Sequence, residues 1–384
     1  MMFAPTKFLP FATTGLFSWP GKFRAGMDLF IPKKHVPAGE RNDETLESFI
    51  LRRMGREILE RLAEPLVGGV HGSDPASTSL AATFPNLLDM EQKYGNMIRG
   101  FLAQRKMVEE MRKKYPPDPK NPRTFFTAYK KGMHELPLAM ADWAGREKIR
   151  TSATVTAVAR NEDGTWIVTL LDGETVTGDA VVFATESWAA EPLVRAIDST
   201  IAATLAAIPA SSSATVSFAF DEAEFGVNMN AFGVLVPEVE KRALLAATYS
   251  STKWPGRAPK GTVLLRAFIG GPNNQTVMEK SDEEIREIAL AELRSILGIN
   301  PEAKPLFSRF YRWTLGMPQY SVGHLDRVEL IEARSAEIPG LALAGGSYRG
   351  VGLPNCIESG EAAVGKILGE WGIEFADEEE QRSY

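Results

Sequence analysis

The sequence has little of the chemistry that most catalytic or metal sites need. It contains one cysteine, Cys356, which excludes an internal disulfide framework and fits a reducing compartment. The four histidines, His35, His71, His134 and His324, are far apart in the sequence, and none stands at metal-ligand spacing. No G-x-S-x-G motif occurs. The sequence therefore predicts no metal site, and no clustered catalytic residues are assigned.

Long hydrophobic runs and an excess of positive charge are also missing. No run of 18 apolar residues occurs, so no membrane-spanning helix is predicted. The 43 Lys and Arg residues against 49 Asp and Glu residues give a net charge of −6, which does not favour nucleic acid as a partner. The G-x-G-x-x-G motif of dinucleotide-binding folds matches nowhere.

What is present is typical of a globular protein. The 384 residues are 44% hydrophobic and 24% charged, which fits two or three domains with a buried core. Aromatic residues are concentrated near the N-terminus, where they form either a packed core or a surface that meets a membrane or a flat ligand. These residues are Phe3, Phe8, Phe11, Phe17, Trp19, Phe23 and Phe30.

The next segment predicts helices. Apolar residues recur at helical spacing over residues 42–67, and Gly68-Gly69 is expected to end that part. A second helical stretch is expected over residues 87–114. Its basic end is either a solvated face or a contact with anionic lipid. The amphipathic pattern of residues 136–143 predicts a further helix.

The middle of the chain predicts strands. Asp163-Gly164 and Asp172-Gly173 separate alternating apolar runs, which predicts a β-meander. Ala180–Thr185 is a continuous apolar run, as expected for a strand covered on both faces. Residues 200–310 read as a second α+β unit, and Ser281 with Glu284 forms a capping box that opens a helix ending at Gly298.

One segment predicts a ligand site. A short strand, Leu341–Ala344, runs into a glycine-rich stretch over residues 345–352 and then into an amphipathic helix. A glycine-rich loop before a helix exposes backbone N–H groups and the positive end of the helix dipole to a ligand. A plain tight connection between strand and helix is the alternative.

Four blocks carry a resemblance. The chain resembles the flavin-dependent protoporphyrinogen/coproporphyrinogen oxidase family, within the amine-oxidase-like flavoproteins. The residues from Ala344 to Gly360 are similar to the family's C-terminal flavin signature. Met317–His324 resembles its P-Q-Y-x-x-G-H block, and Phe232–Pro237 resembles an F-G-x-L-V-P segment. Ala4–Phe30 resembles the entry to its helical, membrane-facing region.

The resemblance implies roles for individual residues. FAD is the implied cofactor, and its ring would lie beside the glycine-rich loop and helix start, at Gly345, Gly346, Val351, Gly352 and Leu353. Val155 would contact the adenine through its backbone, and Trp313 would lie beside the flavin. Phe232, Gly233 and Leu235 would face the tetrapyrrole. The implied reaction is stepwise hydride removal from protoporphyrinogen IX or coproporphyrinogen III in heme biosynthesis, with oxygen as acceptor.

The resemblance also implies the fold. We expect an α/β (mixed α+β) protein with a Rossmann-like FAD domain built from residues 123–198 and 311–384. Residues 1–122 would form a helical, membrane-facing cap, and residues 199–310 a substrate-binding α+β domain. Family members begin with a βαβ unit that carries G-x-G-x-x-G. This chain lacks it, so it is expected to start late, to be a fragment or to be an inactive descendant.

Three functions remain open at this stage. The first is a cytoplasmic, FAD-dependent porphyrinogen oxidase with peripheral contact to the inner face of the cell membrane. The second is a flavin-free remnant that still binds porphyrin. The third is another amine-oxidase-like flavoenzyme. The sequence does not distinguish between the two porphyrinogens, and it does not give the oligomeric state.

Overall fold

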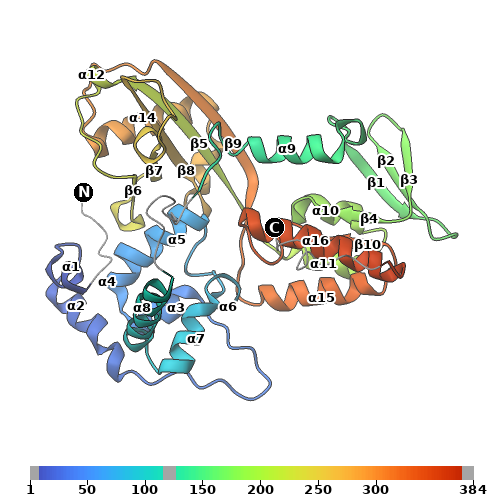
Figure 1. The fold of residues 1–384 in the computed structure, drawn as a ribbon, viewed down its shortest axis with the longest axis horizontal. Coiled ribbons are helices and arrows are strands. Elements are labelled where there is room, and N and C mark those ends of the chain that lie inside the picture. The colour runs from blue at the N-terminus through green and yellow to red at the C-terminus, as the bar shows by residue number, and fades with distance from the viewer. Residues whose placement is uncertain (1–7, 116–126, 374–384) are drawn as a thin grey trace. The chain divides into compact units, whose positions relative to one another are not determined.

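The computed structural model describes residues 8–115 and 127–373. The chain divides into two compact units, the first comprising residues up to Ile149 and Ser211–Met317, and the second comprising Arg150–Ala210 and the residues from Pro318 onward. Figure 1 shows the elements of both units. The expected division into three parts stays a prediction. Phe3 and the first residues of the Ala4–Phe30 block lie outside the described residues.

The N-terminal part of the first unit is helical, as expected, but its breaks lie elsewhere. The helix α5 runs through Gly68-Gly69 and ends at Gly72, whose backbone is left-handed at φ +59°. The stretch over residues 87–114 is two helices, because Gly95 ends the first and the Asn96 side chain caps the second. The elements are α1 (Phe8–Thr13), α2 (Trp19–Gly26), η1 (Met27–Phe30), α3 (Leu46–Arg53), α4 (Arg56–Ile58), η2 (Leu59–Ala63), α5 (Glu64–His71), α6 (Leu80–Thr83), α7 (Pro85–Tyr94), α8 (Met97–Lys114), α9 (Glu135–Ala144) and η3 (Arg146–Lys148).

Buried ions and an apolar cluster hold these helices together. The side chains of Asp28, Arg53 and Glu91 are fully buried, and the Arg53 Nε lies 2.6 Å from Asp28 Oδ1.

The helix α9 forms where its pattern predicts it. However, none of its residues is buried and Trp143 is 92% exposed, so the expected apolar face is not covered by described residues.

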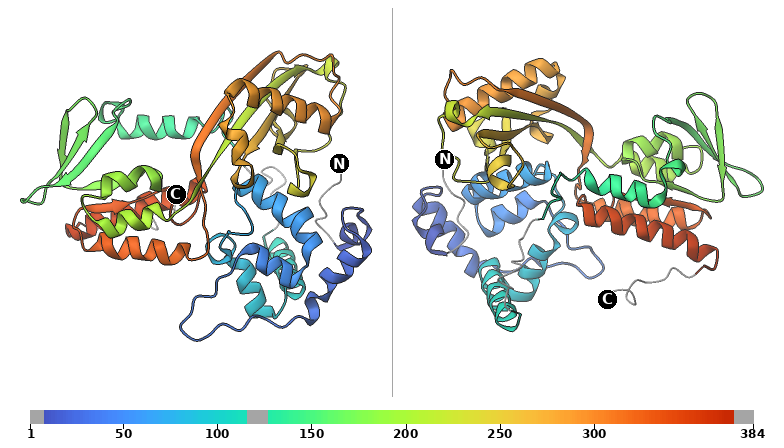
Figure 2. Two further views of the ribbon diagram at one scale, coloured as in Figure 1. Left: turned by 180° about the vertical axis from the view of Figure 1, so that it is seen from behind. Right: turned by 45° about the horizontal axis from the view of Figure 1, so that its top comes forward.

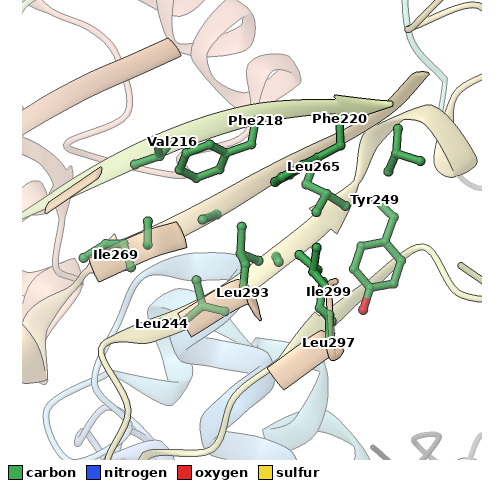
Figure 3. Close-up of a cluster of buried hydrophobic side chains, with 14 of the residues drawn as sticks. Val216, Phe218, Phe220, Leu244, Tyr249, Leu265, Ile269, Leu293, Leu297 and Ile299 are labelled. Carbon is green, nitrogen blue, oxygen red and sulfur yellow. The ribbon is translucent and has the colours of Figure 1, made fainter. Parts of the chain in front are cut away.

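The rest of the first unit is a five-stranded sheet in the order β6-β7-β8-β5-β9, with α14 along one face (Figure 2). Ser281 and Glu284 form both bonds of the predicted capping box. Figure 3 shows the apolar core between α14 and the sheet. The elements are β5 (Ala210–Asp221), α12 (Glu222–Phe225), β6 (Gly233–Leu235), η4 (Glu238–Glu240), β7 (Leu244–Tyr249), α13 (Ser250–Lys253), β8 (Thr262–Gly270), η5 (Pro272–Glu279), α14 (Asp282–Leu297) and β9 (Phe307–Pro318).

The second unit contains the predicted meander and a pair of parallel strands. Strands β1, β2 and β3 form an antiparallel sheet, and Gly164 and Gly173 supply the positive φ angles that its two turns require. Strands β10 and β4 pair in parallel. The elements are β1 (Val155–Arg160), β2 (Trp166–Leu170), β3 (Thr175–Gly178), β4 (Val181–Phe183), α10 (Ser187–Val194), α11 (Ser199–Ala206), α15 (His324–Ala336), β10 (Leu341–Leu343) and α16 (Leu353–Glu370).

Strand β4 corrects one expectation. We expected a strand covered on both faces, but Val182 is 38% exposed while Phe183 is buried. Helix α16 covers β10, because Ala342 and Ala344 pack against its residues Ala363 and Ile367. Helix α16 does not cover Val182. Burial on both faces, which we expected for β4, is therefore found for β10 instead.

Candidate functional site

The glycine-rich loop lies at the carboxyl end of the parallel strand pair. Leu343 of β10 pairs with Phe183 of β4, and both strands leave the sheet at the same edge. One leads through residues 184–186 to α10, and the other leads through residues 345–352 to α16. In open α/β sheets, ligands bind outside the carboxyl ends of the strands. This edge is therefore the candidate ligand site of the second unit.

A tyrosine and a histidine from one block fasten the loop. The Tyr320 hydroxyl donates to the Gly346 carbonyl at 2.6 Å and accepts from the Gly350 N–H at 2.8 Å. The fully buried His324 places its Nε2 2.6 Å from the Tyr348 carbonyl oxygen, and its ring stacks on that of Tyr320. Burial raises the pKa of Tyr320 to about 12, so the hydroxyl keeps the proton that it donates.

Other side chains hold the start of the loop. The Ser359 hydroxyl accepts from the Gly345 N–H at 3.0 Å. The Ser347 hydroxyl donates to the Glu186 carboxylate and accepts from the Ser187 N–H, which joins the loop to the start of α10. Burial raises the pKa of the Cys356 thiol, and the negative charge of Glu186 acts in the same direction. The loop is thus anchored along its length.

The start of α16 is open for a ligand. Gly352 is its N-cap residue, and within the described ranges no side-chain cap hydrogen bond forms at the start of this 18-residue helix. Val351 is 40% exposed and Leu353 is 52% exposed, so apolar side chains border these donors. A Cβ on Gly350 would lie 2.7 Å from Asn355, at a φ of +143° that favours glycine. Uncapped donors beside apolar groups fit a flat ring on which negative charge develops.

The structure brings five of the nominated cofactor residues into this one loop and helix start: Gly345, Gly346, Val351, Gly352 and Leu353. Val155 opens β1 in the same unit, and β1 packs against α10. The sequence analysis missed Tyr320, His324 and Glu186. The P-Q-Y-x-x-G-H block contained the signal for the first two, but nothing in the sequence indicated that its ring side chains reach this loop.

The nominated substrate residues lie on the five-stranded sheet of the first unit. Strand pairing places Leu235 in a row with Ala246, Phe268 and Thr215. The Trp313 Nε1 donates to the Thr215 hydroxyl at 3.2 Å, so Trp313 shares the face of Leu235, opposite α14. The alternation of the strands puts Gly233 on that face too, and Phe232 next to it is 67% exposed. The position of Trp313 beside the flavin stays a prediction, and within its own unit Trp313 lies on the sheet face that carries Leu235.

Helix α5 crosses this face closely at one end. A Cβ on Gly69 would lie 2.5 Å from Leu235 Cδ2, so a larger residue there would require the Leu235 side chain to move. One turn earlier, the Glu64 carboxylate accepts from the Glu238 N–H at 3.0 Å, just after β6. Burial raises the pKa of Glu64 to about 7, and the carboxylates of Glu238 and Asp74 add to the rise. These carboxylates line a cavity of about 490 Å³.

The raised pKa makes a pH-dependent stability prediction. A carboxyl group whose pKa is higher in the folded state than in the unfolded state stabilises the fold at pH values below its unfolded-state pKa. This contribution is lost as the pH rises through its folded-state pKa. Glu64 thus destabilises the first unit above pH 7. We expect Glu64→Gln to raise the free energy of unfolding at pH 8.5 by about 1–2 kcal/mol, after allowance for partial exposure.

Urea unfolding of both proteins at pH 5 and pH 8.5 measures this effect. Glutamine keeps a carbonyl oxygen that can accept from the Glu238 N–H, so the difference between the two proteins should be much smaller at pH 5 than at pH 8.5. An equal difference between the two proteins at both pH values would show that Glu64 does not titrate in this range.

Among the described residues, no helix is both long and apolar enough to span a bilayer.

Comparison with known proteins shows the family of this chain. The model of the flavin containing amine oxidoreductase family matches residues 2–368, and the chain belongs to this family. It is 32% identical over 377 residues to the coproporphyrinogen III oxidase of Bacillus subtilis, covering 96% of this chain and 76% of that protein. It is 31% identical over 382 residues to the chloroplastic protoporphyrinogen oxidase 1 of Spinacia oleracea, covering 95% and 66%.

Solved structures agree with this placement. A crystal structure named "Putative protoporphyrinogen oxidase", from Exiguobacterium sp. 255-15, matches with a TM-score of 0.79 and 26% identity, covering 96% of this chain and 76% of that one. Cyclohexylamine oxidase from Brevibacterium oxydans matches with a TM-score of 0.59 and 17% identity, which shows a shared fold. The mixed α/β architecture expected from the sequence is confirmed.

Proposed function

We propose that this protein is an FAD-dependent oxidase that converts coproporphyrinogen III or protoporphyrinogen IX to the porphyrin in heme biosynthesis, with oxygen as the electron acceptor. The observation that carries the proposal is the 32% identity to a coproporphyrinogen III oxidase over 96% of the chain. The open start of α16 beside an anchored glycine-rich loop is what a flavin site requires.

Bound FAD supplies the hydride acceptor. The chain's own residues bind and orient. Gly345, Gly346, Val351, Gly352 and Leu353 would border its ring, and the backbone of Val155 would contact the adenine. The uncapped N–H groups of α16 would stabilise negative charge on a ring held there. No side chain needs to act as a general acid or base.

On the substrate side, Phe232, Gly233 and Leu235 contact the flat tetrapyrrole, and Trp313 extends the same surface. Gly233 and Leu235 lie on β6 and Phe232 directly precedes it, within the substrate domain that we assign to residues 199–310; Trp313 lies on β9, the edge strand of the same sheet, which extends beyond this range. The helices of residues 1–122 form the cap, and the remaining segments form the FAD domain.

The test measures cofactor and turnover separately. We expect the purified chain to bind FAD in a fluorescence titration and to convert coproporphyrinogen III to fluorescent porphyrin with consumption of oxygen. A parallel assay with protoporphyrinogen IX decides between the two substrates. Failure to bind FAD and to turn over either porphyrinogen would overturn the proposal.

The second candidate is a flavin-free protein that still binds porphyrin. Binding of porphyrin without binding of FAD would identify this function. Turnover of an amine in place of a porphyrinogen would identify another amine-oxidase-like flavoenzyme.

We further propose a cytoplasmic location with peripheral contact to the membrane through α2 and η1. Trp19, Phe23 and Phe30 are 75%, 73% and 81% exposed, and the Lys22 ammonium lies over the Trp19 ring. Exposed aromatic rings beside a cation suit an anionic bilayer surface.

We expect Phe23→Asp to lower co-sedimentation with anionic liposomes. Equal sedimentation of the variant and the unchanged protein would contradict this contact.

A further inference from the structure

Arg266 lies in the middle of the sheet face that carries the substrate residues. Strand pairing places it in one row with Gly233, Thr248 and Ser217. It is the only exposed residue of β8, whose other residues are buried or partly buried. The row is built from small side chains on both sides of the arginine, so its neighbours leave the guanidinium uncovered.

The guanidinium of Arg266 is largely available. Its Nε lies 3.4 Å from the Ser217 hydroxyl oxygen, a long contact. Within the described part of the chain, no carboxylate forms an ion pair with it. In the same unit, by contrast, Arg242 pairs with Glu292 and Arg312 pairs with Asp282. An arginine has five N–H donors in a fixed fork, so most of the donors of Arg266 lack a protein acceptor.

The neighbouring row is apolar except for Thr215. Leu235 and Phe268 lie in it, and Trp313, half exposed, continues it through its bond to Thr215. A flat apolar strip beside a single cation matches a ligand with a wide hydrophobic body and an acidic edge. The guanidinium fork binds a carboxylate through two parallel hydrogen bonds.

We propose that Arg266 binds a propionate carboxylate of the tetrapyrrole and thereby sets the orientation of the macrocycle on the sheet face. This inference rests on the proposed function, because that function supplies a substrate with carboxylate side chains. It adds a substrate-binding residue to the three that the family resemblance implied.

The experiment compares two porphyrins that share one macrocycle and differ in their four propionate groups, which are free carboxylates in one and neutral methyl esters in the other. Coproporphyrin III and its tetramethyl ester, dispersed in the same detergent, are titrated against the full chain with porphyrin fluorescence as the readout. Arg266→Gln removes the charge, and Arg266→Lys keeps it without the fork. The matched control is Arg286→Gln. Arg286 pairs with Glu283 on α14, the helix that covers the opposite face of the sheet.

We expect Arg266→Gln to raise the Kd for coproporphyrin III about tenfold and to leave the Kd for the ester unchanged. Arg266→Lys should recover part of the loss, and Arg286→Gln should behave as the unchanged protein. A structural effect of the substitution would weaken the acid and the ester equally, so the difference between the two ligands isolates the carboxylate contact.

Three results overturn the inference, and they are distinguishable by what they leave of the proposed function. Equal binding of coproporphyrin III by the unchanged protein and Arg266→Gln would remove Arg266 and leave the proposed function standing. The same holds if both porphyrins are weakened alike. No porphyrin binding by the unchanged protein would overturn the inference together with the porphyrinogen assignment.

Discussion

Replacing Arg53 by methionine is expected to lower the free energy of unfolding of the first unit by about 3–5 kcal/mol. Arg53 is fully buried, and its guanidinium faces the buried carboxylates of Asp28 at 2.6 Å and Glu91 at 3.5 Å. Methionine fills much of the space of the side chain but leaves the Asp28 carboxylate without its cation, while Glu91 keeps its ion pair with Arg52. A buried unpaired charge is costly.

The same guanidinium also binds the backbone. It donates to the carbonyls of Ile31 at 2.8 Å and Gly95 at 3.2 Å, which ties the segment after η1 to the loop between α7 and α8. The second Asp28 oxygen accepts from the Ile98 N–H at the start of α8. Loss of Arg53 therefore weakens several helices at once, and the midpoint of thermal unfolding should fall by roughly 6–20 °C.

Urea and thermal unfolding measure this loss. Arg56→Met is the matched control, because Arg56 is 69% exposed at its side chain and pairs only with Glu60 on its own helical face, so a change within about 0.5 kcal/mol is expected. Adding Asp28→Asn to Arg53→Met should restore part of the stability, since it removes one unpaired carboxylate. A loss for Arg53→Met no larger than that of the control would contradict the prediction.

Replacing Tyr320 by phenylalanine is expected to raise the Kd for FAD about tenfold. The substitution keeps the ring that stacks on His324 and removes the hydroxyl that bridges Gly346 and Gly350. Each lost hydrogen bond is worth about 1 kcal/mol, and the loop then spends less time in its binding conformation. Apparent affinity falls in proportion to the fraction of molecules in the competent state.

A flavin fluorescence titration measures this change, and Tyr94→Phe on α7 is the control for the loss of a tyrosine hydroxyl elsewhere. Because the pKa of Tyr320 is about 12, the difference between Tyr320 and its variant should be constant from pH 6 to pH 9. Unchanged FAD affinity in Tyr320→Phe, with the control also unchanged, would show that the loop keeps its shape without this bridge.

Several features follow from the sequence because their causes are local. The capping box of Ser281 and Glu284 involves residues three apart, and the Asp-Gly turns fix the meander within a few residues. The glycine-rich loop between strand and helix was also found in place, since glycine spacing and helix periodicity are properties of one short segment. Local hydrogen bonds and turn geometry decide all of these.

Other local predictions failed because a distant segment decided them. Gly68-Gly69 was expected to end a helix, but packing of α5 against Leu235 of β6 favours small residues inside that helix. Val182 was expected to be covered, but the position of α16 leaves it exposed. Apolar periodicity records which residues could be buried, and only the partner element determines which of them are.

The sequence alone determined the family resemblance, the glycine-rich loop that precedes α16, and the residue types of that loop and of the sheet face in the first unit. Only the tertiary structure decided that Tyr320 and His324 hold that loop, and that Arg266 stands in a row with Gly233 on the sheet face of Leu235 and Trp313. The reason is physical: strand register and side-chain hydrogen bonds join residues that are tens of positions apart, and no pattern within one segment encodes which distant partner it will meet.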